Sequence, residues 1–397
     1  MTSQTWPRLP ISEVCELAVD CVNKTAPTAD VETPFKMIRT TNVKNGFVDT
    51  DDVRFVTEEV FTKWTRRSKP ECGDVILTRE APLGEVGRFR SQGQVMLGQR
   101  LFHYRANPSR IHPEYLAYVL QSPEVQGRIR SKGFGATVEH ARVGDCENLL
   151  IPVPELSIQE TIGTTLAAYD DLIQNNQRRI KLLEGAARLI YREWFVQLRF
   201  PGFEHARIVE GIPEGWSKVT LGDLADVVMG QSPDSKFYND VGAGLPFHQG
   251  VKDFGLRYPT TRMYCSGPGR VAEEGDILVS VRAPVGRLNY ANSKMVIGRG
   301  LAAVRSKTGN QGLLFQLLKG FFFKEDIIGS GAIYAAVTRS EFLGIELLSP
   351  PPSVAEEFGS IIDPIEKQIR NLGESNERLV RARDLLLPRL MSGEIEV

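Results

Sequence analysis

The side chains that most often carry catalysis or bind metal ions are few and scattered in this sequence. Its histidines show no spacing typical of metal ligands, so we expect surface or structural roles for them. The five cysteines are odd in number and never spaced CxxC, which fits neither a disulfide framework nor a zinc site. We therefore predict no metal site in this chain, and thiols that are buried or inert.

Sequence signatures of common enzyme classes are absent as well. The chain contains no GxxxxGK(S/T), GxGxxG, HExxH or GxSxG motif. It also lacks the Asn/Asp-Pro-Pro-Tyr/Phe run of amino-methyltransferases. Pro233-Asp234 could begin a nuclease-like acidic set, but no separate Asp/Glu-x-Lys follows it within thirty residues. These absences disfavour a methyltransferase or nuclease within this chain, and we predict that it has no catalytic residues.

One stretch occurs twice, as GDVILTREAPLGEVGRF at residues 73–89 and as GDILVSVRAPVGRL at residues 275–288. Each copy has Gly-Asp, a short apolar run with one hydroxyl residue, then Ala-Pro, one aliphatic residue and Gly. Glycine permits the positive φ of a tight turn, proline fixes its entry, and aspartate can cap the local backbone. We therefore predict that this stretch builds the same structural platform twice, and that the side chains varying around it decide what each platform binds.

Further segments repeat in the same order and divide the chain into two similar domains and two long helices. Each half has a Pro-Phe segment, an alternating apolar segment with a central glycine, a helix, a glycine-rich loop and a proline-interrupted strand. The predicted boundaries are 1–155 for the first domain, 156–200 for the central helix, 201–352 for the second domain and 353–397 for the C-terminal helix. The fold class that this organisation predicts is α+β, with two similar mixed α/β globular domains.

The two long helices have the strongest periodicity, because apolar residues recur at alternating steps of three and four over about four heptads. The predicted seam consists of Leu166, Tyr169, Ile173, Asn176, Ile180, Leu183 and Ile190 in the first helix, and of Ile362, Ile365, Ile369, Leu372, Asn376, Leu379 and Leu386 in the second. We predict that the helices pair as an antiparallel intramolecular coiled coil that relates the two domains by a pseudo-twofold axis. Asparagine in the seam costs stability but can fix the register.

A different packing stays open at this point, in which each helix simply lies on its own domain. The strict seam is narrower than the apolar stripe of a surface helix, which favours helix pairing. With 397 residues, of which 42% are hydrophobic and 24% charged, the composition is typical of a soluble globular protein. No run of eighteen apolar residues and no signal-like start occurs, so we expect a cytoplasmic protein.

Two similar binding surfaces on a spacer suit duplex DNA, whose backbone is itself twofold symmetric. Because the two domains differ in sequence, we expect two different half-sites, and therefore an asymmetric target with a gap. Base edges and phosphates are read by polar and basic side chains on projecting loops. The candidates for DNA contact are Arg39, Thr40, Asn42, Lys44, Arg79, Arg88, Lys132 and Thr137 in the first domain, and Gln231, Ser232, His248, Gln249, Lys252, Arg282, Arg287 and Tyr334 in the second.

The charge distribution gives this DNA hypothesis only local support. The formal net charge is -1, basic and acidic residues balance over 1–155, and basic residues exceed acidic ones by one over 201–350. Specific binding would then need clustered charge and partners that help to neutralise phosphates, so we expect weak DNA binding by the isolated chain. The alternative is a two-domain scaffold that binds protein or glycan and has no salt-dependent affinity for duplexes.

The repeated strand and turn, the glycine loop, the proline stop and the long helix together resemble the specificity subunit of type I restriction-modification systems. Residues 151–195 are similar to that family's central conserved region and residues 353–397 to its distal one. The resemblance covers essentially the whole chain, although the helix entry SVAEEF departs from the family's usual start. It implies a non-catalytic DNA reader in which each domain is a target recognition domain.

The same resemblance implies partners and places the chemistry on them. The expected partners are double-stranded DNA, two methyltransferase subunits and restriction or translocase subunits, and no membrane is expected. S-adenosylmethionine for adenine methylation, and ATP and Mg for translocation, would bind those partner subunits. No cofactor is therefore expected in this chain.

Overall fold

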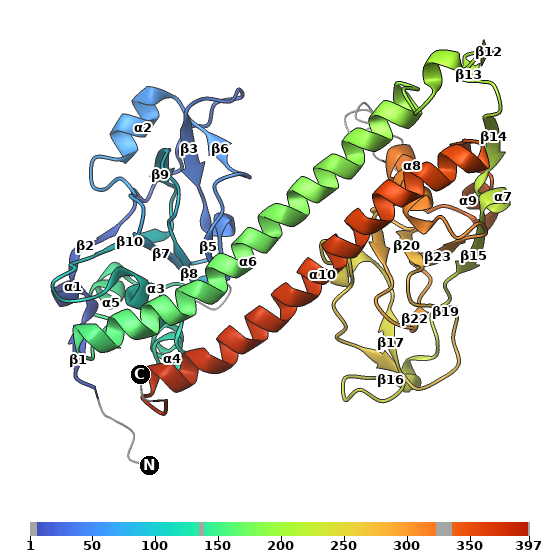
Figure 1. The fold of residues 1–397 in the computed structure, drawn as a ribbon. Helices are drawn as coiled ribbons and strands as arrows, with labels where there is room; N and C mark the ends of the chain where they lie inside the picture. The colour runs from blue at the N-terminus through green and yellow to red at the C-terminus, as the bar shows by residue number, and fades with distance from the viewer. Residues whose placement is uncertain (1–5, 135–138, 323–335, 396–397) are drawn as a thin grey trace. The chain divides into compact units, whose positions relative to one another are not determined.

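The computed structural model describes residues 6–134, 139–322 and 336–395. The chain divides into two compact units, of which unit 1 contains Met1–Gln174 with Glu377–Val397 and unit 2 contains Asn175–Asn376. Each unit therefore holds one domain together with the adjoining part of both long helices. Figure 1 shows the helices and strands of both units.

The core of unit 1 lies between a six-stranded sheet and two helices. The strand order is β2-β10-β7-β8-β5-β4, and these strands span Cys15–Asp20, Leu101–Ala106, Val75–Arg79, Leu83–Arg88, Gly46–Val48 and Val43–Lys44. Strand β7 is a short apolar run with four fully buried residues, as expected for a strand with neighbours on both sides. Helices α3 (Pro113–Gln121) and α4 (Pro123–Ser131) start at prolines, whose φ suits a first helical turn, and pack into the same apolar core.

A smaller sheet and several short elements complete domain 1. The smaller sheet has the order β6-β3-β9, and its strands span Arg54–Phe55, Phe35–Ile38 and Gln94–Leu97. Helix α2 (Glu58–Trp64) packs on this sheet through Phe61. The remaining elements are β1 (Arg8–Pro10), its antiparallel partner β11 (Leu150–Pro152), and the short helices α1 (Ile11–Val14) and α5 (Val143–Glu147).

Domain 2, in unit 2, has a closely similar arrangement. One sheet has the order β15-β23-β20-β21, spanning Ala225–Met229, Leu301–Ser306, Ile277–Ser280 and Leu288–Tyr290. The other has the order β16-β18-β17-β22-β19, spanning Tyr238–Asn239, Tyr264–Cys265, Leu245–His248, Met295–Ile297 and Val271–Ala272. The remaining elements are β12 (Ile208–Val209), β13 (Ile212–Pro213), β14 (Ser217–Thr220), β24 (Glu346–Ser349), α7 (Leu221–Leu224), α8 (Gln311–Phe322) and α9 (Arg339–Leu343).

Equivalent residues of the two domains pair in the same register. Thr78 of β7 lies opposite Leu101 of β10, and Ser280 of β20 lies opposite Leu301 of β23. In the other sheet of each domain, β3 pairs with β9 and β17 pairs with β22, and both pairs are parallel. The internal repeat predicted from the sequence is therefore confirmed at the level of strand pairing.

The repeated Ala-Pro turn is held by the same hydroxyl group in both domains. The buried hydroxyl of Thr78 donates to the carbonyl of Pro82 at 2.6 Å, and that of Ser280 donates to the carbonyl of Pro284 at 2.6 Å. Each hydroxyl oxygen also accepts from the backbone N–H seven residues further on, at 2.9 Å and 2.8 Å. The Ala-Pro bond is cis in both copies. The hydroxyl residue of the motif thus has a structural role.

The aspartate of the repeated Gly-Asp pair is buried and binds an arginine of the neighbouring strand. Asp74 accepts from Arg105 at 2.9 Å, and Asp276 accepts from Arg305 at 2.7 Å. Domain 1 adds His103, whose Nε2 lies 2.6 Å from Asp74. Burial alone would raise the pKa of Asp74, but hydrogen bonds from His103 and Arg105 outweigh it and lower the pKa to about 2. This carboxylate is therefore ionised and anchors the strand.

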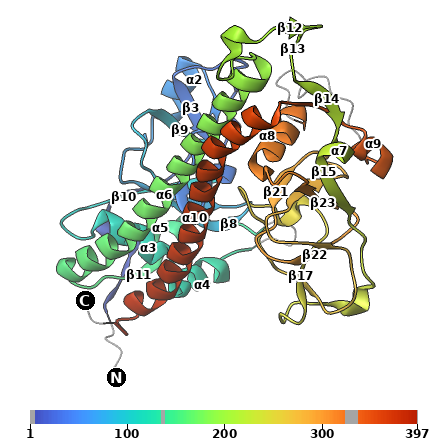
Figure 2. The same ribbon diagram turned by 45° about the vertical axis from the view of Figure 1, so that its right-hand side comes forward.

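The two long helices end slightly earlier than the sequence boundaries predict. Helix α6 spans Leu156–Tyr191 and passes into a π-helical turn, Arg192–Val196, so that it stops before residue 200. Helix α10 spans Pro352–Met391 and stops before the last residues of the chain. Within each unit, the parts of α6 and α10 lie side by side in both views (Figure 1, Figure 2).

The helix parts run in opposite directions within unit 2. Asn176 of α6 contacts Asn376 of α10, whereas Trp194, in the π-helical turn that follows α6, contacts Phe358, which lies earlier in α10. Nδ2 of Asn176 donates to Oδ1 of Asn376 at 3.0 Å, so the two seam asparagines are hydrogen-bonded to each other. In unit 1, the start of α6 and the end of α10 share one apolar core. The predicted antiparallel pairing is thus present in each unit.

The predicted seam residues point into these helix pairs. Leu166, Ile173, Asn176, Ile180, Ile362 and Ile369 are buried, and Tyr169, Leu183, Ile190, Ile365, Leu372, Asn376, Leu379 and Leu386 are half-buried. Leucines outside the seam, such as Leu172, Leu182 and Leu189, are exposed. Burial therefore follows the alternating steps of three and four along both helices.

Candidate DNA interface

A polar pocket of about 200 Å³ opens in domain 2 beside the Ala-Pro turn. Its lining includes Gln249 after β17, Ser280 of β20, Arg282, and Arg299 with Gly300 before β23. Among the residues that the structure describes, neither Arg282 nor Arg299 pairs with a carboxylate. The pocket therefore presents guanidinium groups that suit a ligand rich in hydrogen-bond acceptors.

Ser232 ties two residues of this pocket together. Its Oγ lies within hydrogen-bond distance of the backbone N–H and Nε of Arg299, both at 3.3 Å, and of Nε2 of Gln249, at 3.2 Å. These hydrogen bonds restrain the guanidinium plane and the amide at the same time. Ser232 therefore acts as a positioning residue, and the terminal nitrogens of Arg299 stay available to a ligand.

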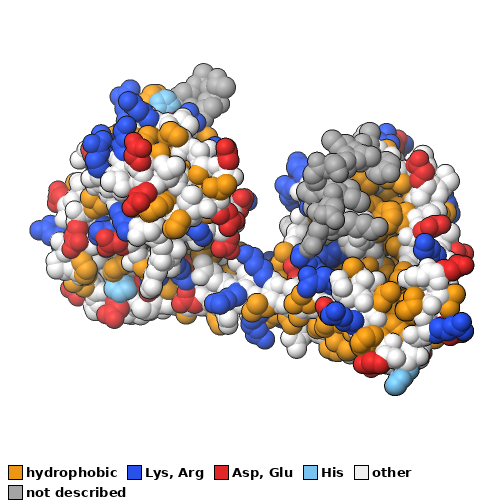
Figure 3. Space-filling model, turned by 90° about the horizontal axis from the view of Figure 1, so that it is seen from above, with side chains coloured by type: hydrophobic (Ala, Val, Ile, Leu, Met, Phe, Trp, Pro, Cys, Tyr) orange, Lys and Arg blue, Asp and Glu red, His pale blue; other side chains and the backbone are white. Residues whose placement is uncertain are grey.

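Charge elsewhere on the surface is mixed. Figure 3 shows Lys and Arg side chains interspersed with Asp and Glu side chains on the face that it displays. This agrees with the formal net charge of -1 and with the near balance within each domain. Any contact with the DNA backbone must then rest on locally clustered basic groups.

The structure distributes the predicted contact residues unevenly. Lys44, Lys132, Gln231, Gln249, Lys252, Arg282 and Arg287 are exposed, and Arg39, Thr40, Arg79, Arg88 and Ser232 are half-buried. Thr137 and Tyr334 lie outside the described residues. Only Ser232, Gln249 and Arg282 of these lie in or beside the pocket. Arg88 donates to Glu114 at 2.7 Å and Arg79 to the carbonyl of Ala141 at 3.1 Å, so both arginines have partners inside domain 1.

Two of the predicted contact residues are buried, which corrects the expectation that they face DNA. Asn42 is 3% exposed, and its amide accepts from the backbone N–H of Arg39 at 2.8 Å and donates to the carbonyl of Asp52 at 2.6 Å. His248 is 0% exposed at the end of β17. Both side chains are structural, because folding removes them from the surface where a base edge could be read.

The burial of His248 predicts that domain 2 loses stability in mild acid. Burial lowers the pKa of His248 below its ordinary value of 6.5, with Asp253 acting in the opposite direction. In the unfolded chain, His248 binds a proton near pH 6.5, whereas in the folded domain it stays neutral to a lower pH. The full contribution of His248 to the stability of the folded domain is therefore present above pH 6.5. It is lost as the pH falls further, by at most about 1.4 kcal/mol per pH unit.

Thermal unfolding at about pH 7.5 and about pH 5.5 measures this effect. We expect the drop in stability between the two to be smaller in His248→Gln than in the unsubstituted chain. His205→Gln, at an exposed position, is the control and should behave like the unsubstituted chain. Equal drops in His248→Gln and the unsubstituted chain would contradict the assignment.

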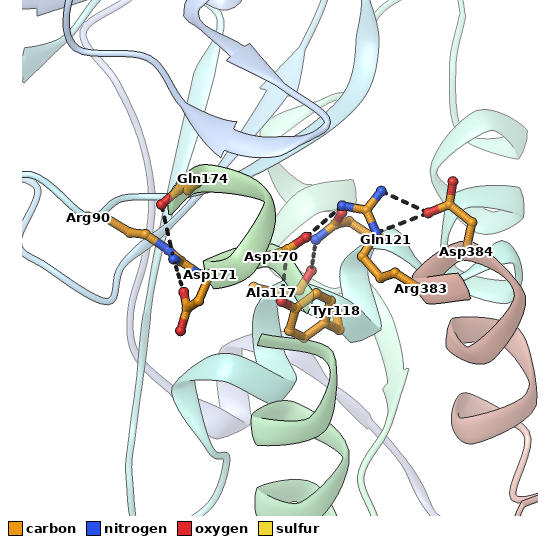
Figure 4. Close-up of polar contacts among 9 residues, drawn as sticks. All are labelled: Arg90, Ala117, Tyr118, Gln121, Asp170, Asp171, Gln174, Arg383 and Asp384. Carbon is orange, nitrogen blue, oxygen red and sulfur yellow. Dashed lines mark hydrogen bonds and ion pairs between the residues drawn. The ribbon is translucent and has the colours of Figure 1, made fainter. Parts of the chain in front are cut away.

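A separate set of polar contacts joins domain 1 to its helices (Figure 4). The buried carboxylate of Asp170 on α6 accepts from the hydroxyl of Tyr118 on α3 and from Nη1 of Arg383 on α10, both at 2.6 Å. Arg90 contacts α6 next to this point, at Asp171. Burial and the neighbouring Asp170 raise the pKa of Tyr118, so its hydroxyl stays a donor. These contacts hold α3, α6 and α10 of unit 1 together.

Unit 2 has an equivalent junction with different partners. Glu366 lies four residues after the seam residue Ile362 in α10, just as Asp170 lies four residues after the seam residue Leu166 in α6. It accepts from Nε of Arg257 at 3.1 Å and from Gln316 of α8 at 3.3 Å. Arg257 also lies 3.4 Å from Glu184 of α6. A buried arginine thus connects domain 2 to both helix parts of unit 2.

Sequence reasoning missed Arg299 and the junction residues. Arg299 follows Gly298 in the segment VIGRGL, and Gln99 follows the equivalent Gly98 in the segment VMLGQRL. This difference between two otherwise similar segments was the sequence signal that could have identified Arg299. No comparable signal existed for Arg257, which stands in an irregular loop. Its partner Glu366 lies 109 residues further along the chain.

Two general searches cover the described ranges only. Within residues 6–134, 139–322 and 336–395, no helix is both long enough and apolar enough to cross a membrane. In the same ranges, no group of three or more His, Cys, Asp or Glu side chains is arranged so that it could hold a metal ion.

Comparison with known proteins assigns the family. The type I restriction modification DNA specificity domain matches this chain at residues 4–185 and again at residues 213–380. The chain belongs to this family. The resemblance inferred from the sequence is thereby confirmed, and the two matches fall on the two copies of the internal repeat.

Individual relatives agree with this family assignment. A protein of Methanocaldococcus jannaschii assigned as the type I restriction enzyme MjaX specificity subunit is 32% identical over 338 residues, which cover 82% of this chain and 79% of that protein. The MjaIX specificity subunit of the same organism is 24% identical over 367 residues, covering 87% and 82%. The crystal structure of the type I restriction-modification S subunit from M. genitalium is 18% identical with a TM-score of 0.60 and covers 97% of this chain and 96% of that chain, which shows a shared fold.

Proposed function

We propose that this chain is the DNA sequence-recognition subunit of a type I restriction-modification complex and that it reads a bipartite, asymmetric target with a gap. As a specificity subunit it is non-catalytic, and the chemistry resides on partner subunits. The observation that carries the proposal is the repeated platform. Thr78 and Ser280 hold the same turn, whereas Glu80 stands in domain 1 where Arg282 stands in domain 2. One scaffold with different side chains gives each domain its own base preference.

We further propose that two methyltransferase subunits bind along the helices and that restriction subunits join this complex. Leu182 and Leu189 of α6 in unit 2 are seven residues apart and are 65% and 51% exposed, and Val196, in the π-helical turn that follows α6, is 59% exposed. They lie outside the seam that α6 uses against α10. An exposed apolar stripe with heptad spacing suits a partner helix, which supports a protein partner on this face.

S-adenosylmethionine, ATP and Mg are proposed to bind the partner subunits and not this chain. The chain's own residues would recognise the target and hold the methyltransferase subunits on it. A cytoplasmic location, where the DNA of a prokaryotic host is found, stays a prediction.

Methylome sequencing of a host with and without this gene tests the proposal. We expect a gapped motif containing methylated adenine that vanishes on deletion and returns on complementation. The purified complex should bind that duplex specifically, whereas the chain alone should bind DNA weakly and with strong salt dependence. An unchanged methylome, or transfer of methyl groups by the chain without partners, contradicts the proposal.

The same purified complex tests the docking face. Leu182→Lys combined with Leu189→Lys should abolish copurification with the methyltransferase subunits, because lysine cannot be buried against a partner helix without cost. Gln177→Lys, at an exposed polar position of the same helix, is the matched control and should leave copurification intact. Retention of the partners by the double variant would show that they bind elsewhere.

A further inference from the structure

We infer that the pocket of domain 2 reads a guanine in the half-site of that domain, with Arg299 as the base-contacting residue and Ser232 as its positioning residue. This inference rests on the proposed DNA recognition and adds the residue and the base that it reads. It follows from the orientation of Arg299, from the backbone that forms the pocket, and from the contrast with domain 1.

Arg299 is restrained in a way that suits a base edge. Its backbone N–H and its Nε both donate to the Oγ of Ser232 at 3.3 Å, which leaves Nη1 and Nη2 as the available donors. An arginine fork matches the adjacent N7 and O6 acceptors of guanine in the major groove. A fork held in one orientation discriminates between bases, whereas a phosphate contact carries no sequence information and needs no such restraint.

The pocket depends on a close backbone approach at Gly300. The N–H of Gly300 donates to the carbonyl of Gln249 at 3.1 Å, and a Cβ at this glycine would lie 2.4 Å from the same oxygen. A larger residue would push the Gln249 segment away from Arg299. The glycine therefore keeps both side chains at one pocket and within reach of Ser232.

Domain 1 can be compared residue by residue at this place. The N–H groups of Gly98 and Gly298 each donate at 2.8 Å to the last carbonyl of the parallel neighbouring strand. The residues that follow these glycines are therefore equivalent, Gln99 to Arg299 and Arg100 to Gly300.

Domain 1 fills the equivalent place with an ion pair. Arg100 lies 3.0 Å from Glu80, and Glu80 is equivalent to Arg282. Arginine and glutamate compensate each other there, whereas domain 2 has two arginines without a carboxylate partner among the described residues. The guanine pocket is therefore particular to domain 2, and the two half-sites are read by different chemistry.

The test uses the full chain assembled with its methyltransferase subunits, and duplexes that carry every single-base change of the methylated motif. Arg299→Lys keeps the charge and removes the fork. We expect it to reduce discrimination at one guanine position of one half-site roughly tenfold, with the other positions and the salt dependence of binding unchanged. Arg262→Lys, at an exposed arginine of the same domain outside the pocket, is the control and should leave every position unchanged.

Ser232 gives an independent arm if Arg299→Lys impairs assembly. Ser232→Ala should relax the same guanine position by a smaller factor, and Ser232→Thr, which keeps the hydroxyl, should restore the original preference. A merely structural serine would lower the amount of folded complex without changing the preference at that single position.

Two patterns overturn the inference. If Arg299 contacts a phosphate, Arg299→Lys preserves every base preference, and Arg299→Ala weakens all sequences equally while lowering the salt slope by about 0.9. Relaxation at a base other than guanine, or in both half-sites, also contradicts it. If the unsubstituted complex does not distinguish its motif from a scrambled duplex, the proposed function itself fails, which is a separate result.

Discussion

Replacing Arg257 with methionine is expected to lower the free energy of unfolding of unit 2 by about 3–5 kcal/mol. Arg257 is 5% exposed, donates to Glu366 and lies 4.1 Å from the ring centroid of Phe315. Burial opposes its charge, but Glu366 outweighs that effect and raises the pKa of Arg257. Methionine would fill part of the volume and leave Glu366 and Glu184 without their shared cation.

Thermal unfolding measures this loss. The transition of unit 2 should fall by about 10 °C, because 1 kcal/mol shifts the melting temperature of a unit of this size by about 2–4 °C. Adding Glu366→Leu to Arg257→Met should recover most of the loss, since a buried ion pair replaced by apolar groups is often neutral. Arg262→Met, which removes the exposed partner of Asp253, should cost less than about 1 kcal/mol. Similar losses at Arg257 and Arg262 would contradict the role given to burial.

Replacing Asp170 with asparagine should destabilise unit 1 by about 3 kcal/mol. Asparagine keeps the shape of the side chain but removes the charge that Arg383 and the Tyr118 hydroxyl bind at 2.6 Å. Among the described residues, Arg383 would keep the ion pair with Asp384, which is mostly exposed. The measurement is the free energy of unfolding of unit 1 by denaturant.

The neighbouring Asp171 provides a matched control for Asp170. Its carboxylate is 63% exposed and pairs with Arg90, so Asp171→Asn should cost less than about 1 kcal/mol. Both substitutions make the same chemical change on the same helix, one residue apart. If they cost the same, burial of the carboxylate does not govern this junction.

The polar contacts of Asp170 and of Glu366 show that the two copies of the repeat have diverged. Asp170 and Glu366 occupy equivalent helix positions, yet Asp170 takes its cation from the opposite helix through Arg383, and Glu366 takes it from a domain loop through Arg257. If domain 2 were exchanged between related chains, the incoming domain would therefore need an arginine at the position of Arg257. Otherwise Glu366 would remain largely buried without its cation, at the cost expected for Arg257→Met.

Much of the architecture was predictable because it is written in local patterns. The steps of three and four predicted the seam, since burial along a helix depends on residue spacing alone. The duplicated Gly-Asp and Ala-Pro motifs predicted two copies of one platform, since the turn needs those residues wherever it occurs. His248 and Asn42 were predicted wrongly as DNA contacts, because a polar residue in a short strand or turn can face inward when its hydrogen bonds are satisfied or its charge is suppressed.

What the amino-acid sequence determined by itself was the repeat, the two long helices and the family. Which side chains contact one another depends instead on how the elements pack. Ser232 contacts Gln249 and Arg299 across 17 and 67 residues, and Asn176 contacts Asn376 across 200. Periodicity reports which face of one element is buried, but a pocket or a polar pair forms where separate elements cross, and that depends on how the packed core brings them together.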